Sequence, residues 1–151
     1  MTTKSAIDYE TTQQIEFVVA AFDSGVPQLS AMALVMATIS NVNDNDPVFN
    51  QSEYSAAIFE NSAKGTYVIT VLAEDEDLGE FGKVYYSLTG QRSEDFTIDQ
   101  NGVIRVGPTA ILDREKASAI VIHVVAKDEA SDEMVRRSAS VPVRHYPNLR
   151  Q

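Results

Sequence analysis

The sequence predicts an all-β protein, in which a seven-stranded antiparallel β-sandwich follows the last two strands of a related module. Two observations carry this prediction. Short runs rich in β-branched and aromatic residues are bounded by Gly, Asn, Asp or Ser, and no stretch shows the 3.6-residue period of a helix. In addition, a segment near the start of the chain recurs about a hundred residues later, which is the spacing of sandwich-sized repeats.

The expected strands begin with a hairpin and continue after a polar linker. Residues 15–21 and 31–39 flank a turn cluster at 23–27, so residues 12–40 are predicted to form a long hairpin. Seven further strands are predicted at 54–59, 66–73, 83–88, 96–98, 103–106, 119–126 and 137–144. In the sixth of these, alternation places Ile120, Ile122, Val124 and Ala126 on the core face, and His123 on the opposite face.

The internal repeat defines the expected domains. Ile15, Val19 and Asp23 recur as Ile120, Val124 and Asp128, and Asp8-Tyr9-Glu10 recurs as Asp113-Arg114-Glu115, all at an offset of 105 residues. We therefore expect residues 1–46 to be the C-terminal fragment of one repeat with its linker, residues 47–146 to be a complete repeat, and residues 147–151 to be a tail. Two strands without a partner sheet bury too little apolar surface to form a sandwich alone.

Composition narrows the class of protein. The chain has 151 residues, 44% of them hydrophobic, and a formal net charge of −10, which argues against nucleic acid or an anionic membrane surface as a partner. The absence of cysteine leaves the redox compartment open. No stretch approaches the roughly 18 apolar residues of a membrane span, and Met1–Glu10 lacks the apolar core of a signal peptide, so we expect no direct membrane insertion. An exported protein would contain this sequence as one part.

The acidic residues lie at the ends of the predicted strands. The linker Asn43-Asp44-Asn45-Asp46-Pro47 is dense in oxygen donors, which suit Ca²⁺, whereas Zn²⁺ would ask for His or Cys. Because alternate strand ends of a sandwich meet at one pole, carboxylates from several strands would crowd there and repel one another unless a cation lies between them. We therefore predict a Ca²⁺ site at the junction of the two modules. Its candidate carboxylates are Asp8, Glu10, Asp23, Asp44, Asp75, Asp77 and Asp128.

Five motifs, in this order, resemble the extracellular repeats of the cadherin family. They are Asn43-Asp44-Asn45 with Asp46-Pro47-Val48-Phe49, Ala73-x-Asp75-x-Asp77-x-Gly79 leading into Val84-Tyr85-Tyr86-Ser87, Ile98-Asp99-x-x-Gly102-x-Ile104, Leu112-Asp113-Arg114-Glu115, and Val125-Ala126-x-Asp128. The resemblance covers nearly the whole chain. It implies a Greek-key, immunoglobulin-like β-sandwich and a junction that binds three Ca²⁺ ions.

The resemblance also implies a set of ligands. Asn43 and Asp44 would ligate through side chains, and Val42 and Asn45 through backbone carbonyls. The preceding repeat would supply Asp8 and Glu10, with Tyr9 in place of the usual Arg, and the complete repeat would supply Asp75, Asp77, Asp128 and the carbonyl of Phe81, where the family often has Asn. The base glutamate of the first repeat is missing, which should weaken the outermost ions.

The opposite pole departs from the family pattern. Glu60, Asp113 and Glu115 would gather there, but His145-Tyr146-Pro147-Asn148-Leu149 replaces the second Asn-Asp-Asn linker and offers almost no carboxylate. We therefore expect a second Ca²⁺ site at that pole to be absent or weak.

The predicted function is a non-enzymatic, calcium-dependent cell-adhesion module. Its expected partners are neighbouring repeats and other cadherin molecules, in homophilic or heterophilic contact, and its expected location is extracellular, as part of a single-pass plasma-membrane protein. Alternatives are a non-adhesive Ca²⁺-stiffened spacer and a carbohydrate-handling β-sandwich, which the lack of Trp disfavours. The N-glycosylation sequon Asn50-Gln51-Ser52 would fit an extracellular glycoprotein.

Overall fold

The structure is a computed structural model that describes residues 2–3, 5–113, 115–128 and 138–148. For residues 138–148 it describes the backbone. The chain separates into two compact units, Met1–Val42 and Asn43–Gln151. The described part contains β-strands and one short 3-10 helix, η1 (Ser93–Asp95), and no α-helix occurs in it. The predicted all-β class is therefore confirmed.

The first unit is built on one antiparallel hairpin. β1 (Gln14–Phe22) pairs with β2 (Ser30–Thr38) over its whole length, from Gln14 opposite Thr38 to Phe22 opposite Ser30. These bounds lie within one residue of the predicted ones at each end. No residue of either strand is buried, because the hairpin has no second sheet to pack against within its own unit.

Asp23 organises the turn of this hairpin. Its Oδ1 accepts hydrogen bonds from the backbone N–H groups of Gly25 (3.0 Å) and Leu29 (2.9 Å), and its own N–H donates to the carbonyl of Leu29 (3.0 Å). Bonds from Leu29 and Gly25 stabilise the ionised carboxylate, so they lower the pKa of Asp23. The side chain therefore acts as the internal acceptor of the turn.

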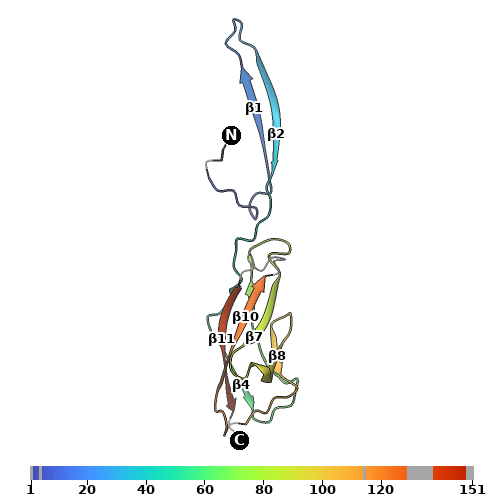
Figure 1. Ribbon diagram of the computed structural model, residues 1–151, viewed down its shortest axis with the longest axis vertical. Helices are drawn as coiled ribbons and strands as arrows, with labels where there is room; N and C mark the ends of the chain where they lie inside the picture. Colours follow the sequence, from blue (N-terminus) through green and yellow to red (C-terminus); the bar gives the residue numbers. More distant parts are fainter. Residues whose placement is uncertain (1, 4, 114, 129–137, 149–151) are drawn as a thin grey trace. The chain divides into compact units, whose positions relative to one another are not determined.

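The second unit is a β-sandwich of seven strands. One sheet has the order β4 (Tyr54–Phe59), β11 (Ser138–Asn148), β10 (Ile120–Asp128), β7 (Val84–Thr89). The other has the order β5 (Tyr67–Thr70), β9 (Val103–Val106), β8 (Phe96–Ile98). Figure 1 shows β11, β10 and β7 side by side. β4 and β11 are parallel, and the other pairs in these sheets are antiparallel.

The core lies between the two sheets of the sandwich. Along β10 the burial alternates, so that Ile120, Ile122, Val124 and Ala126 are buried, whereas His123 is exposed. The predicted core face of this strand is confirmed. From the other sheet and the loop after β9, the core receives Val68, Phe96, Ile104, Val106 and Leu112.

The predicted strand at 66–73 is two strands. β5 ends at Thr70, and β6 (Ala73–Glu74) pairs with a short strand that the sequence reading missed, β3 (Val48–Phe49). Between β5 and β6 the chain crosses from one neighbouring segment to another. Val71 N–H still donates to the carbonyl of Gly102 (3.0 Å), next to β9, whereas the carbonyl of Leu72 already accepts from the N–H of Asn50 (3.0 Å), next to β3. Gly102 has a positive φ of 72°, and a Cβ there would lie 2.0 Å from the Val71 carbonyl oxygen, so a side chain would block this crossing.

The last predicted strand is longer than expected. The prediction was 137–144, and β11 continues to Asn148 in parallel register with β4, from Val143 opposite Tyr54 to Asn148 opposite Phe59. Residues 145–148, expected in the linker position, are therefore strand. Residue 137 and the end of the expected tail, 149–151, lie outside the described residues.

Candidate functional site: an acidic pole on the second unit

The pairing of β3 with β6 positions the linker beside the acidic run. Val48 lies opposite Glu74 and Phe49 opposite Ala73. Continuing this antiparallel register backwards along the linker and forwards past β6 places Asn45 opposite Asp77. A two-residue strand therefore determines which oxygen atoms meet at this end of the sandwich.

Hydrogen bonds fix this arrangement. The backbone N–H of Asn45 donates to Oδ2 of Asp77 (3.2 Å), and Nδ2 of Asn45 donates to Oδ1 of the same carboxylate (2.7 Å). Asp128, the last residue of β10, reaches the same end of the sandwich, and its Oδ2 accepts from Nδ2 of Asn43 (2.7 Å). Asp77 and Asp128 are only 4% and 2% exposed, so these two carboxylates lie in a nearly solvent-free position.

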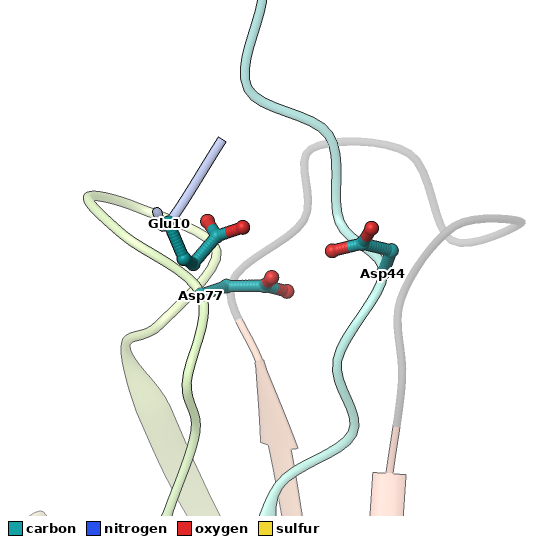
Figure 2. A group of neighbouring side chains, drawn as sticks. All are labelled: Glu10, Asp44 and Asp77. Atoms are coloured by element: carbon teal, nitrogen blue, oxygen red, sulfur yellow. The ribbon is translucent and has the colours of Figure 1, made fainter. Parts of the chain in front are cut away.

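Asp44 adds a third carboxylate from the linker. Figure 2 shows Asp44 on the linker and Asp77 on the loop after β6, with their carboxylates directed towards each other. An oxygen of Asp44 and an oxygen of Asp77 lie within 4.8 Å. Like charges this close repel, and a cation placed between them would convert repulsion into attraction.

Asp75 carries the clearest sign of electrostatic conflict. Burial raises the pKa of Asp75, and the negative charges of Asp77, Asp128 and Asp46 raise it further, although a hydrogen bond from the backbone N–H of Asp77 (2.9 Å) opposes them. Its Oδ2 is buried and accepts no hydrogen bond within the described part of the chain. A buried carboxylate oxygen that lacks a donor is costly and calls for a positively charged group.

The loop after Asp77 closes tightly on its own backbone. A Cβ at Gly82 would lie 1.9 Å from the carbonyl oxygen of Asp77, so only glycine permits this approach. Phe81, the candidate carbonyl ligand, directly precedes this contact and is half-buried. Neither the close approach at Gly82 nor the hydrogen bond from the Asn45 side chain was identified from the sequence. For Gly82, the only available signal was a glycine two residues before a strand.

We expect Gly82→Ala to destabilise the folded protein by about 1–3 kcal/mol, because the added methyl group forces the loop away from Asp77. Denaturant unfolding measures the loss. Gly79→Ala is the matched control, since a Cβ there meets nothing within 4 Å and only the positive φ of 70° resists it. A loss at Gly82 no larger than that at Gly79 would contradict the close-packed loop.

In the first unit, Asp8 and Glu10 form a turn before β1. Oδ1 of Asp8 accepts from the backbone N–H of Glu10 (3.0 Å), and the Asp8 carbonyl accepts from Thr12 N–H (2.9 Å). The second unit repeats this turn: Oδ1 of Asp113 accepts from Glu115 N–H (2.9 Å), and its carbonyl accepts from the residue four positions on (3.0 Å). The repeat found in the sequence is therefore also a repeat of backbone conformation.

The hairpin separates Asp23 from Asp8 and Glu10. Asp23 follows the last pair of the hairpin, whereas Ile39 N–H donates to the carbonyl of Gln13 (3.0 Å) at the opposite end, next to the Asp8 turn. Strands of nine residues rise about 3.3 Å per residue, so the two ends lie roughly 30 Å apart. The structure does not bring Asp23 together with the other acidic residues of its unit, and Val42, which is exposed, closes that unit.

At the other pole of the second unit, Asp113 already has a cationic neighbour. Nζ of Lys116 lies 3.3 Å from Oδ2 of Asp113, and this bond, with the backbone N–H of Glu115, lowers the pKa of Asp113. Asn61, next to Glu60, donates its N–H to the carbonyl of Leu112 (2.9 Å), which brings these two segments together in space.

Comparison with protein families identifies the family of the second unit. The model of the Cadherin domain family matches residues 54–144, which is more than half of the chain. The chain belongs to the cadherin family. This cadherin chain is 41% identical over 142 residues to Cadherin-87A of Drosophila melanogaster, covering 93% of the chain and 7% of that protein. It is 38% identical over 135 residues to human Protocadherin alpha-11, covering 87% of the chain and 14% of that protein.

A solved structure supports the same assignment. The cadherin chain superimposes on mouse Cadherin-23 EC22-24 with a TM-score of 0.87 and 37% sequence identity, over 95% of this chain and 45% of that one. The chain thus spans a small part of the curated relatives that it matches. Within the residues that the structure describes, no helix has the length and apolar character needed to cross a membrane.

Proposed function

We propose that this cadherin chain is a calcium-dependent cell-adhesion module in which Ca²⁺ at the junction of two repeats stiffens the linker. The observation that carries the proposal is the acidic pole of the complete repeat. Buried carboxylates of Asp77 and Asp128 lie there beside Asp75, whose Oδ2 accepts no hydrogen bond from the described residues, and Asp44 faces Asp77. These are hard oxygen donors, and they fit Ca²⁺.

The ligands that we propose for Ca²⁺ come from three segments. The linker would supply the side chains of Asn43 and Asp44 and the carbonyls of Val42 and Asn45. The complete repeat would supply Asp75, Asp77, Asp128 and the carbonyl of Phe81, and the preceding repeat Asp8 and Glu10. We leave Asp23 out because its carboxylate is the internal acceptor of the hairpin turn at the far end of its unit. The bound ion would supply positive charge that ties the linker to the acidic segments.

Adhesion and location are part of the same proposal. A stiff junction would hold tandem repeats in an extended array outside the cell, anchored by a plasma-membrane protein of which this chain is a part. The surfaces of the array would recognise other cadherin molecules, in homophilic or heterophilic contact. Bead aggregation with the full extracellular region, in Ca²⁺ and in chelator, distinguishes an adhesive array from a spacer that binds no partner.

The experiment that tests the calcium site is a thermal melt of the chain in saturating Ca²⁺, in chelator, and in Mg²⁺ at the same concentration. At about a hundred times its dissociation constant, Ca²⁺ adds about 2.7 kcal/mol per independent site to the folded state. We expect a rise in Tm with Ca²⁺ that Mg²⁺ does not reproduce, because Mg²⁺ demands a smaller octahedral shell and dehydrates reluctantly. Equal shifts with both ions would indicate charge screening alone and would reject the site.

A further inference from the structure

The sequon Asn50-Gln51-Ser52 occupies an exposed connection between two strands of the complete repeat. It begins directly after β3 ends at Phe49 and precedes Tyr54, the first residue of β4. All three of its residues are exposed, and neither Gln51 nor the residue after Ser52 is a proline, which would prevent modification. The sequon is therefore both chemically complete and accessible.

Hydrogen bonds orient the amide of Asn50. Its backbone N–H donates to the carbonyl of Leu72 (3.0 Å), which fixes the main chain. Its side-chain Oδ1 accepts a hydrogen bond from the hydroxyl of Tyr54, a residue that is only 3% exposed. The same hydroxyl lies 3.2 Å from a second acceptor, the Leu72 carbonyl, and its oxygen accepts from Leu72 N–H (3.3 Å). Nδ2 makes no hydrogen bond to any residue that the structure describes. Because the oxygen is held against the protein, the nitrogen is the atom left for a substituent.

Asn50 also lies on the wall of an open groove. The groove has a volume of about 1090 Å³, and its walls include the exposed side chains of Val48 and Leu72 together with the amides of Gln100 and Asn101. Apolar side chains next to amide groups suit a sugar ring, which has C–H faces and hydroxyl groups. The groove extends to the acidic pole, because Asp46, Glu74, Asp75 and Glu76 also line it. These carboxylates disfavour an anion, or a second copy of a chain with a net charge of −10, as the occupant of the part beside Asn50.

We propose that Asn50 carries an N-linked glycan whose first sugar lies in this groove against Val48 and Leu72. The inference rests on the extracellular location in the proposed function. In the modification, Nδ2 of Asn50 forms a bond to C1 of the first N-acetylglucosamine and loses a proton. The bond from that C1 to the phosphate oxygen of a lipid-linked pyrophosphate oligosaccharide breaks, and the lipid pyrophosphate leaves. The hydrogen bond from the Tyr54 hydroxyl is retained in the glycosylated protein, because its acceptor is Oδ1 and the glycan is attached to Nδ2.

The first test is the intact mass of the chain secreted from cultured mammalian cells behind a supplied signal peptide, with Ser52→Ala and Ser52→Thr alongside. Ser52→Ala removes the sequon without touching the bond between Asn50 and Tyr54, which Asn50→Gln would break. We expect a glycan on the wild type and on Ser52→Thr, and an unmodified mass for Ser52→Ala. A secreted wild type of unmodified mass would overturn the proposal.

The second test locates the first sugar. The protein is secreted from cells in which mannosidase processing is inhibited, so that its glycan stays high-mannose, and endoglycosidase H then trims that glycan to its first N-acetylglucosamine, as the intact mass verifies. Trimming should leave Tm unchanged, whereas Ser52→Ala should lower it by about 3 °C. Bacterially produced wild type and Ser52→Ala, both without glycan, should melt together and thereby show that the substitution itself is neutral. If the secreted Ser52→Ala protein melts with the trimmed wild type, the placement in the groove is wrong.

The outcome for the glycan is separable from that for calcium. The mass test does not depend on Ca²⁺, and the melts can be run in chelator. Loss of the glycan with a retained Ca²⁺ shift would reject only this inference, and a glycan without any Ca²⁺ shift would reject only the calcium site.

Discussion

Asp77→Asn is expected to remove most of the Ca²⁺-dependent rise in Tm while leaving the Tm in chelator nearly unchanged. Asp77 is 4% exposed, and an oxygen of its carboxylate lies within 4.8 Å of one of Asp44, so its charge is central to the acidic pole. Losing one independent site costs about 2.7 kcal/mol at a hundredfold excess of ligand over its dissociation constant. With about 4–8 °C per kcal/mol in a domain of this size, the lost shift is about 10 °C or more.

Two opposing effects should keep the metal-free stability of Asp77→Asn close to that of the wild type. Asparagine has one acceptor oxygen, so one of the two hydrogen bonds from Asn45 is lost, at a cost of about 1 kcal/mol. Removing a negative charge beside Asp75, whose pKa its neighbours raise, relieves repulsion and offsets that cost. Differential scanning calorimetry in Ca²⁺ and in chelator measures both effects in one pair of scans.

Glu76→Gln is the matched control for Asp77→Asn. It removes the same charge one residue away, but Glu76 is exposed, so its carboxylate is solvated. We expect the Ca²⁺ shift of Glu76→Gln to equal that of the wild type. If the two variants lose the shift equally, overall negative charge attracts the ion and the arrangement of the acidic pole is irrelevant. If Asp77→Asn melts far lower in chelator as well, the residue is structural.

Local patterns allowed most of the strands to be predicted. The two-residue period of a strand identified the buried face of β10, because successive side chains point to opposite faces and His123 and Lys127 mark the exposed one. The predicted bounds 54–59, 96–98 and 103–106 coincide with β4, β8 and β9, because glycine and acidic or amide residues mark the turns around them. The acidic residues of the pole were also identified as candidate ligands, since a cluster of carboxylates at strand ends does not contribute to an apolar core.

Features that depend on pairing between distant segments could not be predicted. β3 is two residues long and forms only because β6 lies opposite it, so neither strand has a pattern of its own. That pairing places Asn45 against Asp77, so that Asn45 also contributes hydrogen bonds from its side chain and backbone N–H, which the sequence did not indicate. The repeat aligned Asp23 with Asp128 of the other module, but the length of the hairpin, which separates Asp23 from Asp8 and Glu10 within its own unit, was not taken into account.

Ile104→Ala is expected to lower the free energy of unfolding of the second unit by about 3–4 kcal/mol, which corresponds to a fall in Tm of about 12 °C or more. Ile104, in the central strand of the three-stranded sheet, is fully buried, and its partners across that sheet are Ile69 and Ile98. Truncation removes apolar contact and leaves a cavity that neighbouring strands cannot close without breaking their ladders. Urea unfolding followed by circular dichroism measures the loss.

Ile111→Ala is the matched control, because it makes the same chemical change at a side chain that is 68% exposed. Its carbonyl still accepts from Arg92 (2.8 Å), so we expect a change within about 0.5 kcal/mol. Ile104→Ala should also keep the wild-type rise in Tm with Ca²⁺ while its stability without metal falls. The reason is that the free energy of Ca²⁺ binding depends only on the folded site and adds to the stability that the core provides. Asp77→Asn predicts the reverse, a retained metal-free stability and a lost increment. Core packing and metal binding would therefore be separable contributions to the stability of one small sandwich, and a core variant that lost its Ca²⁺ response while folded would show that they are coupled.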